Sequence, residues 1–409
     1  MHAVSLSLLL MTAVPGGADS SVIVLCEGRV ISASGFSIAD DGALTVAVAG
    51  GADADKSIVV ESPALLDASS ATEAGGSYPG KTRTVGAIVQ LTNGEILRAS
   101  IVEPDSPGTI RIDSRELGPL RLTLEKVAAI DLGARRSSQS VTGRGPDPPY
   151  LLLTNGDVVA GAIKGVTPDA VTIDSEFGEA DTDMSRVAAI VLAADPPPAD
   201  GRSAGQLICV LADGQRWYVD AVASGPTGDK VRLSRGAKPV DVPLAAVRQL
   251  VFAGWTVREL ITLDPPEVST TPYLGETVRL QIDDAAHRRP LAIGGRSFVG
   301  GITARPRSRV TYGLVAPAAY LVGWAGMDPL RGSAGVCDVR VASNDKVLFS
   351  FDGLTARVGP RRIAVPIAGL ESIALITDFG ADAEIGDCVN WCDLTLIEKK
   401  LPVSSSRAG

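Results

Sequence analysis

Residues 297–328 read SFVGGITARPRSRVTYGLVAPAAYLVGWAGMD, and this stretch decides the fold class that the sequence predicts. Apolar residues alternate with polar or small ones over short lengths, as in SRVTYGL at 308–314, and glycine and proline interrupt the pattern. A period of two residues is typical of β-strands, whereas a helix repeats every 3.6 residues. The stretch therefore predicts strands joined by turns.

Several landmarks in and after this stretch occur in a recognisable order. Phe298 precedes Gly-Gly-Ile, the segment 308–314 follows, Gly-Met-Asp stands at 326–328, and 387–393 reads DCVNWCD. In this order they resemble the NPCBM/NEW2 family of carbohydrate-binding modules. The resemblance covers residues 259–397 and implies a jelly-roll β-sandwich that binds a glycan.

The segment that the resemblance marks also has the side chains for sugar binding. An aromatic ring can pack against the C–H face of a sugar while a carboxylate or amide binds its hydroxyls. Trp391, Asn390 and Asp393 offer that set, and Asp328 ends an earlier strand of the same module. We expect these four residues to contact a glycan. The alternative for Trp391 is a place in the hydrophobic core.

An acidic loop near the end of the module is a candidate calcium site. Asp378, Asp382 and Asp387 supply carboxylate oxygens close to a predicted strand, and Ca²⁺ takes oxygen ligands. The spacing is not that of an EF-hand. We expect a structural Ca²⁺ here or, as the alternative, a solvated acidic loop.

The middle of the chain contains an internal repeat. Three units each open with a strand, Asn-Gly or Asp-Gly, and a strand, and each closes with an apolar strand. A period this steady over three copies indicates a repeated structural unit. The landmarks are the turn glycines 94, 156 and 214 and the closing valines 127, 187 and 247.

Each unit predicts a small closed barrel. Asn-Gly between strands indicates a hairpin with a type I′ turn, a second hairpin follows, and a final strand completes five. Closure would remove exposed strand edges, so we expect SH3-like or Sm-like barrels at 83–132, 150–192 and 205–253.

The remaining segments complete an all-β organisation, tandem small β-barrels followed by a jelly-roll β-sandwich. The apolar run and small residues near the start predict a cleavable signal peptide. Pro- and Ser/Gly-rich stretches predict linkers. The predicted segments are a signal peptide at 1–18, a poorly defined β segment at 22–61, linkers at 62–82, 133–149 and 193–204, and a disordered tail at 398–409.

Composition bounds the partners and the location. The net charge of −9 argues against nucleic acid, because no basic stripe is available for phosphates. No stretch approaches the ~20 apolar residues of a transmembrane helix. With the signal peptide, this predicts an exported protein of the periplasm, cell envelope or extracellular space.

Five cysteines leave three alternatives open. Cys337 could bridge to Cys392, Cys388 could pair with Cys392, or the cysteines are buried thiols. Their spacing is not that of a zinc site.

No motif in the chain supports catalysis. Residues 75–82 match the phosphate-loop pattern GxxxxGK[ST], but no strand precedes them and a strand follows, so the match is fortuitous. One histidine, His287, remains after the signal peptide, and it lies in a polar turn.

We therefore expect a non-catalytic, exported protein whose C-terminal module binds a glycan or cell-envelope polysaccharide. The alternative is a structural or protein–protein interaction protein that uses the barrels to bind a partner and whose sandwich binds no sugar. A third, weaker possibility is a hydrolase accessory or degenerate enzyme.

Overall fold

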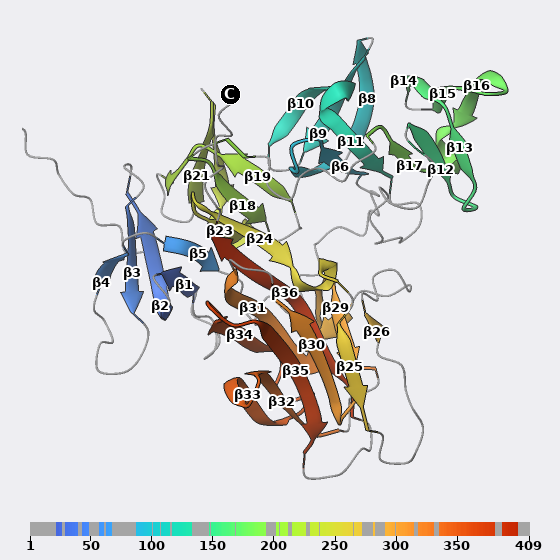
Figure 1. Ribbon diagram of the computed structural model, residues 1–409. Helices are drawn as coiled ribbons and strands as arrows, with labels where there is room; N and C mark the ends of the chain where they lie inside the picture. The colour runs from blue at the N-terminus through green and yellow to red at the C-terminus, as the bar shows by residue number, and fades with distance from the viewer. Residues whose placement is uncertain are drawn as a thin grey trace, which may run out of the picture.

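The computed structural model shows an all-β protein, as the sequence predicts (Figure 1). No helix among the described residues is long and apolar enough to cross a membrane. The structure describes residues 22–26, 29–39, 43–48, 57–60, 63–67, 87–99, 101–106, 108–114, 117–132, 147, 149–167, 169–193, 202–203, 205–211, 215–225, 230–236, 238–264, 266–271, 281–282, 291–298, 300–314, 318–330, 335–380 and 387–399.

The three repeats have the same order of strands. Unit 1 consists of β6 (Ala87–Leu91), β7 (Ile96–Ala99), β8 (Ile101–Ser106), β9 (Thr109–Ser114), β10 (Gly118–Thr123), η2 (Leu124–Lys126) and β11 (Val127–Asp131). Unit 2 consists of β12 (Tyr150–Leu153), β13 (Val158–Ala160), β14 (Ala162–Val166), β15 (Ala170–Ser175), β16 (Gly178–Asp183), η3 (Met184–Arg186) and β17 (Val187–Val191). Unit 3 consists of β18 (Leu207–Leu211), β19 (Arg216–Val219), β20 (Ala221–Ser224), β21 (Lys230–Arg235), β22 (Lys238–Pro243), η4 (Leu244–Ala246) and β23 (Val247–Val251).

Two details of the predicted unit are wrong. Each unit has six strands rather than five, because the chain bends after its second strand and continues in a separate three-stranded sheet. In units 1 and 2, the opening turn is also not type I′, which needs two residues at positive φ. Gly94 and Gly156 have positive φ, whereas Asn93 and Asn155 do not. The asparagine side chains instead bind the backbone and side chain of the residue after each glycine.

Residues 22–67 form a fourth copy of this unit, which we call unit N. It comprises β1 (Val22–Cys26), β2 (Arg29–Ile38), β3 (Leu44–Val48), β4 (Ser57–Val60) and β5 (Pro63–Asp67). It has five strands because β2 runs unbroken and pairs with both β1 and β3, where the other units have two strands. In all four units, the last residue of the first strand pairs with the first residue of the closing strand, and the register then shifts. The pairs are Cys26 with Pro63, Leu91 with Val127, Leu153 with Val187, and Leu211 with Val247. The linker predicted at 62–82 is therefore wrong over β5.

The four units share one 14-stranded sheet instead of standing apart. Its strand order is β13-β12-β17-β11-β6-β7-β19-β18-β23-β5-β1-β2-β3-β4, which places the units in the spatial order 2, 1, 3, N. The closing strands of units 1 and 2 pair through Ile130 and Ile190, and those of units 3 and N pair through Leu250 and Leu66. These four residues occupy the same position in each unit, so both contacts have an approximate two-fold axis.

The C-terminal region is a sandwich of two antiparallel sheets. Its six-stranded sheet comprises β26 (Gln281–Ile282), β29 (Gly301–Ala304), β36 (Val389–Lys399), β31 (Ala318–Met327), β34 (Arg361–Pro366) and β24 (Trp255–Glu259), the last paired with β36. The five-stranded sheet comprises β25 (Glu267–Thr270), β30 (Ser308–Gly313), β35 (Ser372–Phe379), β32 (Cys337–Ser343) and β33 (Lys346–Leu354). A hairpin of β27 (Leu291–Ile293) and β28 (Arg296–Phe298) is separate.

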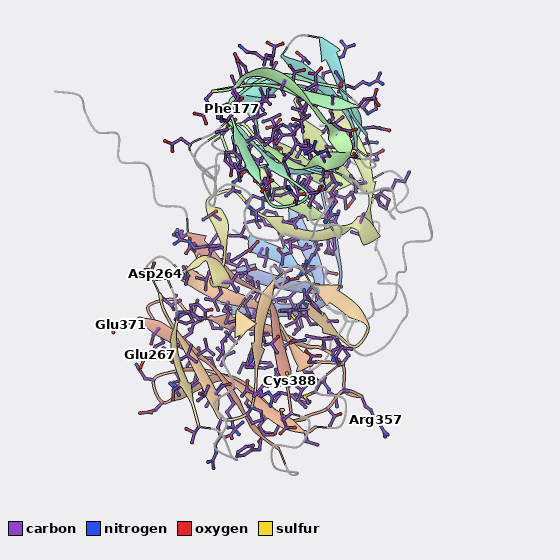
Figure 2. The ribbon with its side chains drawn as sticks, turned by 90° about the vertical axis from the view of Figure 1, so that its right-hand side faces the viewer. Phe177, Asp264, Glu267, Arg357, Glu371 and Cys388 are labelled. Atoms are coloured by element: carbon purple, nitrogen blue, oxygen red, sulfur yellow. The ribbon has the colours of Figure 1, made fainter. Side chains whose placement is uncertain are left out.

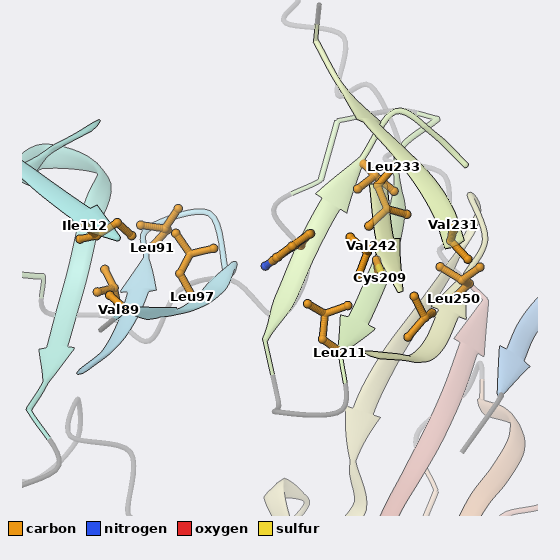
Figure 3. Packing of buried hydrophobic residues seen from close by; sticks show 14 of the residues in the cluster. Val89, Leu91, Leu97, Ile112, Cys209, Leu211, Val231, Leu233, Val242 and Leu250 are labelled. Carbon is orange, nitrogen blue, oxygen red and sulfur yellow. The ribbon is translucent and has the colours of Figure 1, made fainter. Parts of the chain in front are cut away.

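Apolar packing forms one interior for the units and another for the sandwich. Figure 3 shows part of the first, with Val89 and Leu91 of unit 1 and Leu211 and Leu250 of unit 3. A third cluster joins the two parts: Leu25, Leu65, Tyr218 and Val251 pack with Tyr320, Val322 and Ile397 of the six-stranded sheet. The third repeat thus packs directly on the sandwich.

Gly161, at the bend of unit 2, gives a direct test of the repeat geometry. A Cβ at this position would lie 2.5 Å from the backbone oxygen of Asp174, whereas a Cβ on Gly165 would have its nearest neighbour at 3.7 Å. We expect Gly161→Ala to lower the free energy of unfolding by about 1–3 kcal/mol through overpacking. Gly165→Ala should change it little. Urea unfolding of both variants measures the difference, and equal effects would contradict the close approach.

Candidate functional site

Trp391 lies in the core of the sandwich. Its side chain is 0% exposed, and its Nε1–H donates a hydrogen bond to Oγ1 of Thr377 at 3.1 Å. No ring face remains for a sugar. The expectation of a glycan contact at Trp391 is therefore wrong, and the alternative of a core residue is confirmed.

Asn390 is buried beside it and has structural partners. Its Oδ1 accepts a hydrogen bond from Oγ1 of Thr303 at 2.8 Å, and its Nδ2 donates to the carbonyl of Ala292 at 3.0 Å. These bonds hold β29 and the separate β27–β28 hairpin against β36. The amide is 1% exposed as a residue, so it does not reach a ligand in solvent.

Asp393 serves the junction between unit 3 and the sandwich. A bulge in β36 places this residue at φ 47°, outside the strand conformation. Its Oδ2 forms an ion pair with Nη2 of Arg248 at 2.5 Å, and its Oδ1 accepts the N–H of Gly300 at 3.3 Å. Both charged side chains are largely buried, with exposed fractions of 13% and 16%. Asp393 therefore holds two domains together rather than facing a ligand.

The sequence carries a signal for this junction that residue patterns alone did not single out. The position of Arg248 in unit 3 corresponds to Ala128 in unit 1 and Ala188 in unit 2, one residue after each closing valine. A charge at a repeat position that is otherwise alanine indicates a partner outside the repeat.

The outer face of the six-stranded sheet is covered. The β27–β28 hairpin contributes Leu291, Ile293 and Phe298, which pack on Trp324 and Cys392. The guanidinium of Arg362 also lies over the Trp324 ring, 5.4 Å from its centroid. With unit N and unit 3 on the rest of this face, the sheet offers no open platform among the described residues.

The remaining predicted residues meet at one end of the sandwich. Here β29, β31, β33 and β35 finish and β30, β32, β34 and β36 begin. We call it the loop end. Asp328 lies beside Cys388, whose carbonyl accepts the Asp328 N–H at 2.8 Å, and Asp378 is the residue before the last in β35. Asp387, 4% exposed, precedes β36.

The loop end combines charge with partly exposed apolar groups. Arg307 and Arg357 are exposed, Leu330 is 70% exposed, and Phe379 is half-buried. The guanidinium of Arg307 lies 4.9 Å from the Phe379 ring centroid, and this arginine holds φ at 54°. Non-glycine residues in this conformation are uncommon and often occur at functional sites.

The described part of the loop end does not assemble a calcium site. Nowhere in that part of the chain do three His, Cys, Asp or Glu residues cluster as metal ligands. Oδ1 of Asp378 accepts the N–H of Phe379, and Oδ1 of Asp328 accepts the N–H of Leu330. Asp382, the third predicted ligand, lies outside the described residues, as do the signal peptide, residues 75–82 and His287.

None of the five cysteines forms a disulfide, and all are buried. Cys337 belongs to the five-stranded sheet and Cys392 to the six-stranded one, so the strands that carry them are not neighbours. Of the three alternatives left by the sequence, the structure selects buried thiols.

A family model matches residues 264–397, which form an NPCBM/NEW2 domain. The match confirms the resemblance for this third of the chain. No curated protein matches the chain.

Solved structures similar to the chain contain carbohydrate-binding modules. One is CBM51 from Clostridium perfringens GH95 in complex with methyl-galactose, with 21% identity, coverage of 34% of this chain and 99% of that one, and a TM-score of 0.31. Another holds CBM51-2 in complex with GlcNAc and INT domains from Clostridium perfringens ZmpB, with 13% identity, coverage of 42% and 36%, and a TM-score of 0.32. A third contains the tandem CBM51 modules of Sp3GH98 from Streptococcus pneumoniae, with 14% identity, coverage of 61% of this chain and 88% of that one, and a TM-score of 0.30. Scores this low say nothing of what this chain binds.

The ion pair at the junction should be essential for the docking of unit 3 on the sandwich. Arg248→Met leaves Asp393 largely buried without its cation, and such a loss costs about 3–5 kcal/mol. We expect Arg248→Met to lower the free energy of unfolding on this scale, measured by urea denaturation. Adding Asp393→Asn should recover part of the loss, because the unpaired charge is then gone. If the single and double variants were equally unstable, the pair would not be coupled.

Because Cys209 is buried, the free energy of unfolding should fall as the pH rises above 9. Burial raises the pKa of its thiol from 9.0 to about 12, so the unfolded chain loses this proton first as the pH rises. The contribution is complete below pH 9 and is lost between pH 9 and 12. At a pH about 1.5 units above 9, Cys209 alone should account for about 2 kcal/mol. Urea unfolding across this range should show a shallower decline for Cys209→Ala, and parallel curves would contradict the assignment.

Proposed function

We propose that this protein binds a glycan through the loop end of its C-terminal sandwich. The NPCBM/NEW2 match over residues 264–397 is the observation that carries the proposal. The loop end holds the predicted residues that the structure leaves partly exposed, Asp328 and Asp378, whereas Trp391 and Asn390 are buried in the core and Asp393 lies at the junction.

The chemistry of the loop end fits a sugar. Arg307 can donate to hydroxyl oxygens, and the Asp378 carboxylate can accept from hydroxyl groups. Phe379 and Leu330 add apolar surface for the C–H face of a ring, and one side of Phe379 already faces the Arg307 guanidinium. The backbone bond from Phe379 to Asp378 fixes this carboxylate at the rim.

We further propose that the protein is exported and acts without catalysis, as the sequence predicts. Its four repeat units would then carry the sandwich and provide surface for a protein partner. These proposals rest on sequence features in residues 1–18 and on the absence of a catalytic motif in the sequence.

A second candidate is a structural or interaction protein whose sandwich binds no sugar. The observation that favours it is the covered outer face of the six-stranded sheet, where Trp324 packs under the β27–β28 hairpin. That face packs against other parts of the chain and is not available to a ligand.

A glycan array with the full chain tests the proposal. The array should include galactose and N-acetylglucosamine, and titration calorimetry with a hit should give a dissociation constant. Arg307→Ala and Asp378→Asn should each weaken binding about 10-fold or more, since a hydrogen bond to a charged group is worth about 1.5–3 kcal/mol.

Glu371→Gln is the matched control, because Glu371 is exposed before β35 at the opposite end of the sandwich. Figure 2 shows Glu371 on the other side of the sandwich from Cys388 and Arg357. The Glu371→Gln variant should bind the glycan with the affinity of the wild type. Unchanged binding by the loop-end variants would place the site elsewhere, and no binding to any glycan would favour the interaction protein.

A further inference from the structure

Units 1 and 3 contact each other through an edge that each of them presents in the same way. The residue in the middle of the contact is Ile96 in unit 1 and Arg216 in unit 3, and these two are paired across β7 and β19. Both stand five residues after the last residue of the first strand of their unit. The contact is therefore isologous, as in a two-fold symmetric dimer.

The hydrogen bonds at this contact are reciprocal. Oε1 of Glu95 accepts the backbone N–H of Tyr218 at 2.9 Å, and Oε1 of Gln215 accepts the backbone N–H of Arg98 at 3.1 Å. Glu95 and Gln215 occupy the same position of the repeat, as do Arg98 and Tyr218. Both acceptors are 0% exposed, so the two acceptor side chains are buried within the contact.

A second pair of bonds repeats the symmetry. Glu95 forms an ion pair with Arg235 at 2.7 Å, and Gln215 accepts a bond from the hydroxyl of Ser114 at 3.2 Å. Arg235 and Ser114 are the last residues of β21 and β9, which correspond. Units 1 and 3 thus contact each other through equivalent residues, both in the paired strands and at the ends of the neighbouring strands β9 and β21.

The corresponding edge of unit N is also covered. Its second strand, β2, lies close to β34 of the sandwich, and Val30 packs against the cluster that joins the two parts of the molecule. Three of the four equivalent edges are therefore in contact with other parts of the chain.

The fourth edge, in unit 2, has no partner strand among the described residues. Its strand β13 is the end of the 14-stranded sheet, and Val158 at the central position is 38% exposed. Strand edges left open pair readily with another chain. The central residue of this edge, Val158, is uncharged and so does not oppose such pairing. The residue before it, Asp157, occupies the repeat position that Glu95 holds in unit 1 and Gln215 in unit 3.

An exposed aromatic residue marks the same edge. Phe177 is 92% exposed in the turn after β15 and, as Figure 2 shows, lies on the periphery of the upper part of the molecule. Its backbone N–H donates to Oγ of Ser175, just as that of Leu117 donates to Oγ of Ser114 in unit 1. Leu117 packs against the core, in the unit whose edge is covered. The equivalent apolar residue is thus in solvent where the edge is open.

We propose that a second copy of this chain covers the edge, with β13 pairing to β13 about a two-fold axis. The contact repeats the one between units 1 and 3, with Val158 opposite Val158 of the second copy. Asp157 takes the place of Glu95 and accepts the N–H of Ala160 in the other copy. Phe177 loses most of its exposure. The proposal does not depend on glycan binding.

Sedimentation equilibrium of the full chain at 1–100 µM, with a lysine substitution in β13, tests the proposal. The wild type should form a dimer, and Val158→Lys should raise the dissociation constant at least tenfold, because it places two cations across the axis. Val59→Lys is the control, since Val59 is 66% exposed on β4 at the opposite end of the sheet and should leave the dimer intact. A monomer at all concentrations overturns the proposal, as does a Val158→Lys variant that dimerises like the wild type.

A cross-link tests the register. Directly opposed residues in antiparallel strands have Cβ atoms about 4.5–5.5 Å apart, close enough for a disulfide after small adjustments. The native cysteines are all buried, so Val158→Cys adds an accessible thiol. Under mild oxidation it should run as a covalent dimer on a non-reducing gel, and Val59→Cys should not. Equal cross-linking of the two variants would overturn the predicted contact.

Discussion

The need to pair strand edges shapes the repeat region. A unit of five or six short strands leaves edges open on its own, and an open edge exposes unpaired backbone N–H and C=O groups. Here the units close each other's edges. The closing strands pair at one equivalent position, Ile130 with Ile190 and Leu66 with Leu250. The second strands, β7 and β19, pair in another way between units 1 and 3. Pairing between equivalent strands of different units thus joins all four units into a single 14-stranded sheet.

The sandwich depends on this sheet and is not a module on a flexible tether. Tyr218 and Val251 pack with Tyr320 and Ile397, and strand β24 continues from unit 3 into the six-stranded sheet. The Arg248–Asp393 ion pair lies at the same junction. Asp393 reaches it because a bulge turns its side chain out of the strand. The outer face of the six-stranded sheet is thereby buried against the repeat units, whereas the loop end of the sandwich faces solvent.

Local pattern predicted the elements well because it reflects which residues face an interior. The apolar strands that close the three repeats, for example, begin at the predicted valines 127, 187 and 247. Pattern failed for the candidate site. The tryptophan in DCVNWCD has the side chain of a sugar platform, and only the packing of two sheets shows that its ring is inside. The order of the carboxylates along the chain likewise could not show that Asp328 and Asp378 finish strands at one end.

The sequence by itself determined the all-β class, the period of the repeat and the NPCBM/NEW2 character of the C-terminal third, since these follow from alternation, glycine placement and local motifs. The sequence pattern does not mark the fourth unit because its landmarks differ: Cys26 stands in place of leucine, Pro63 in place of valine, and its opening turn is shorter. Only the tertiary structure decided the spatial order of the units, the burial of Trp391 and the role of Asp393. These depend on contacts between residues far apart in the sequence, such as Ile130 with Ile190 and Arg248 with Asp393, which local sequence does not encode.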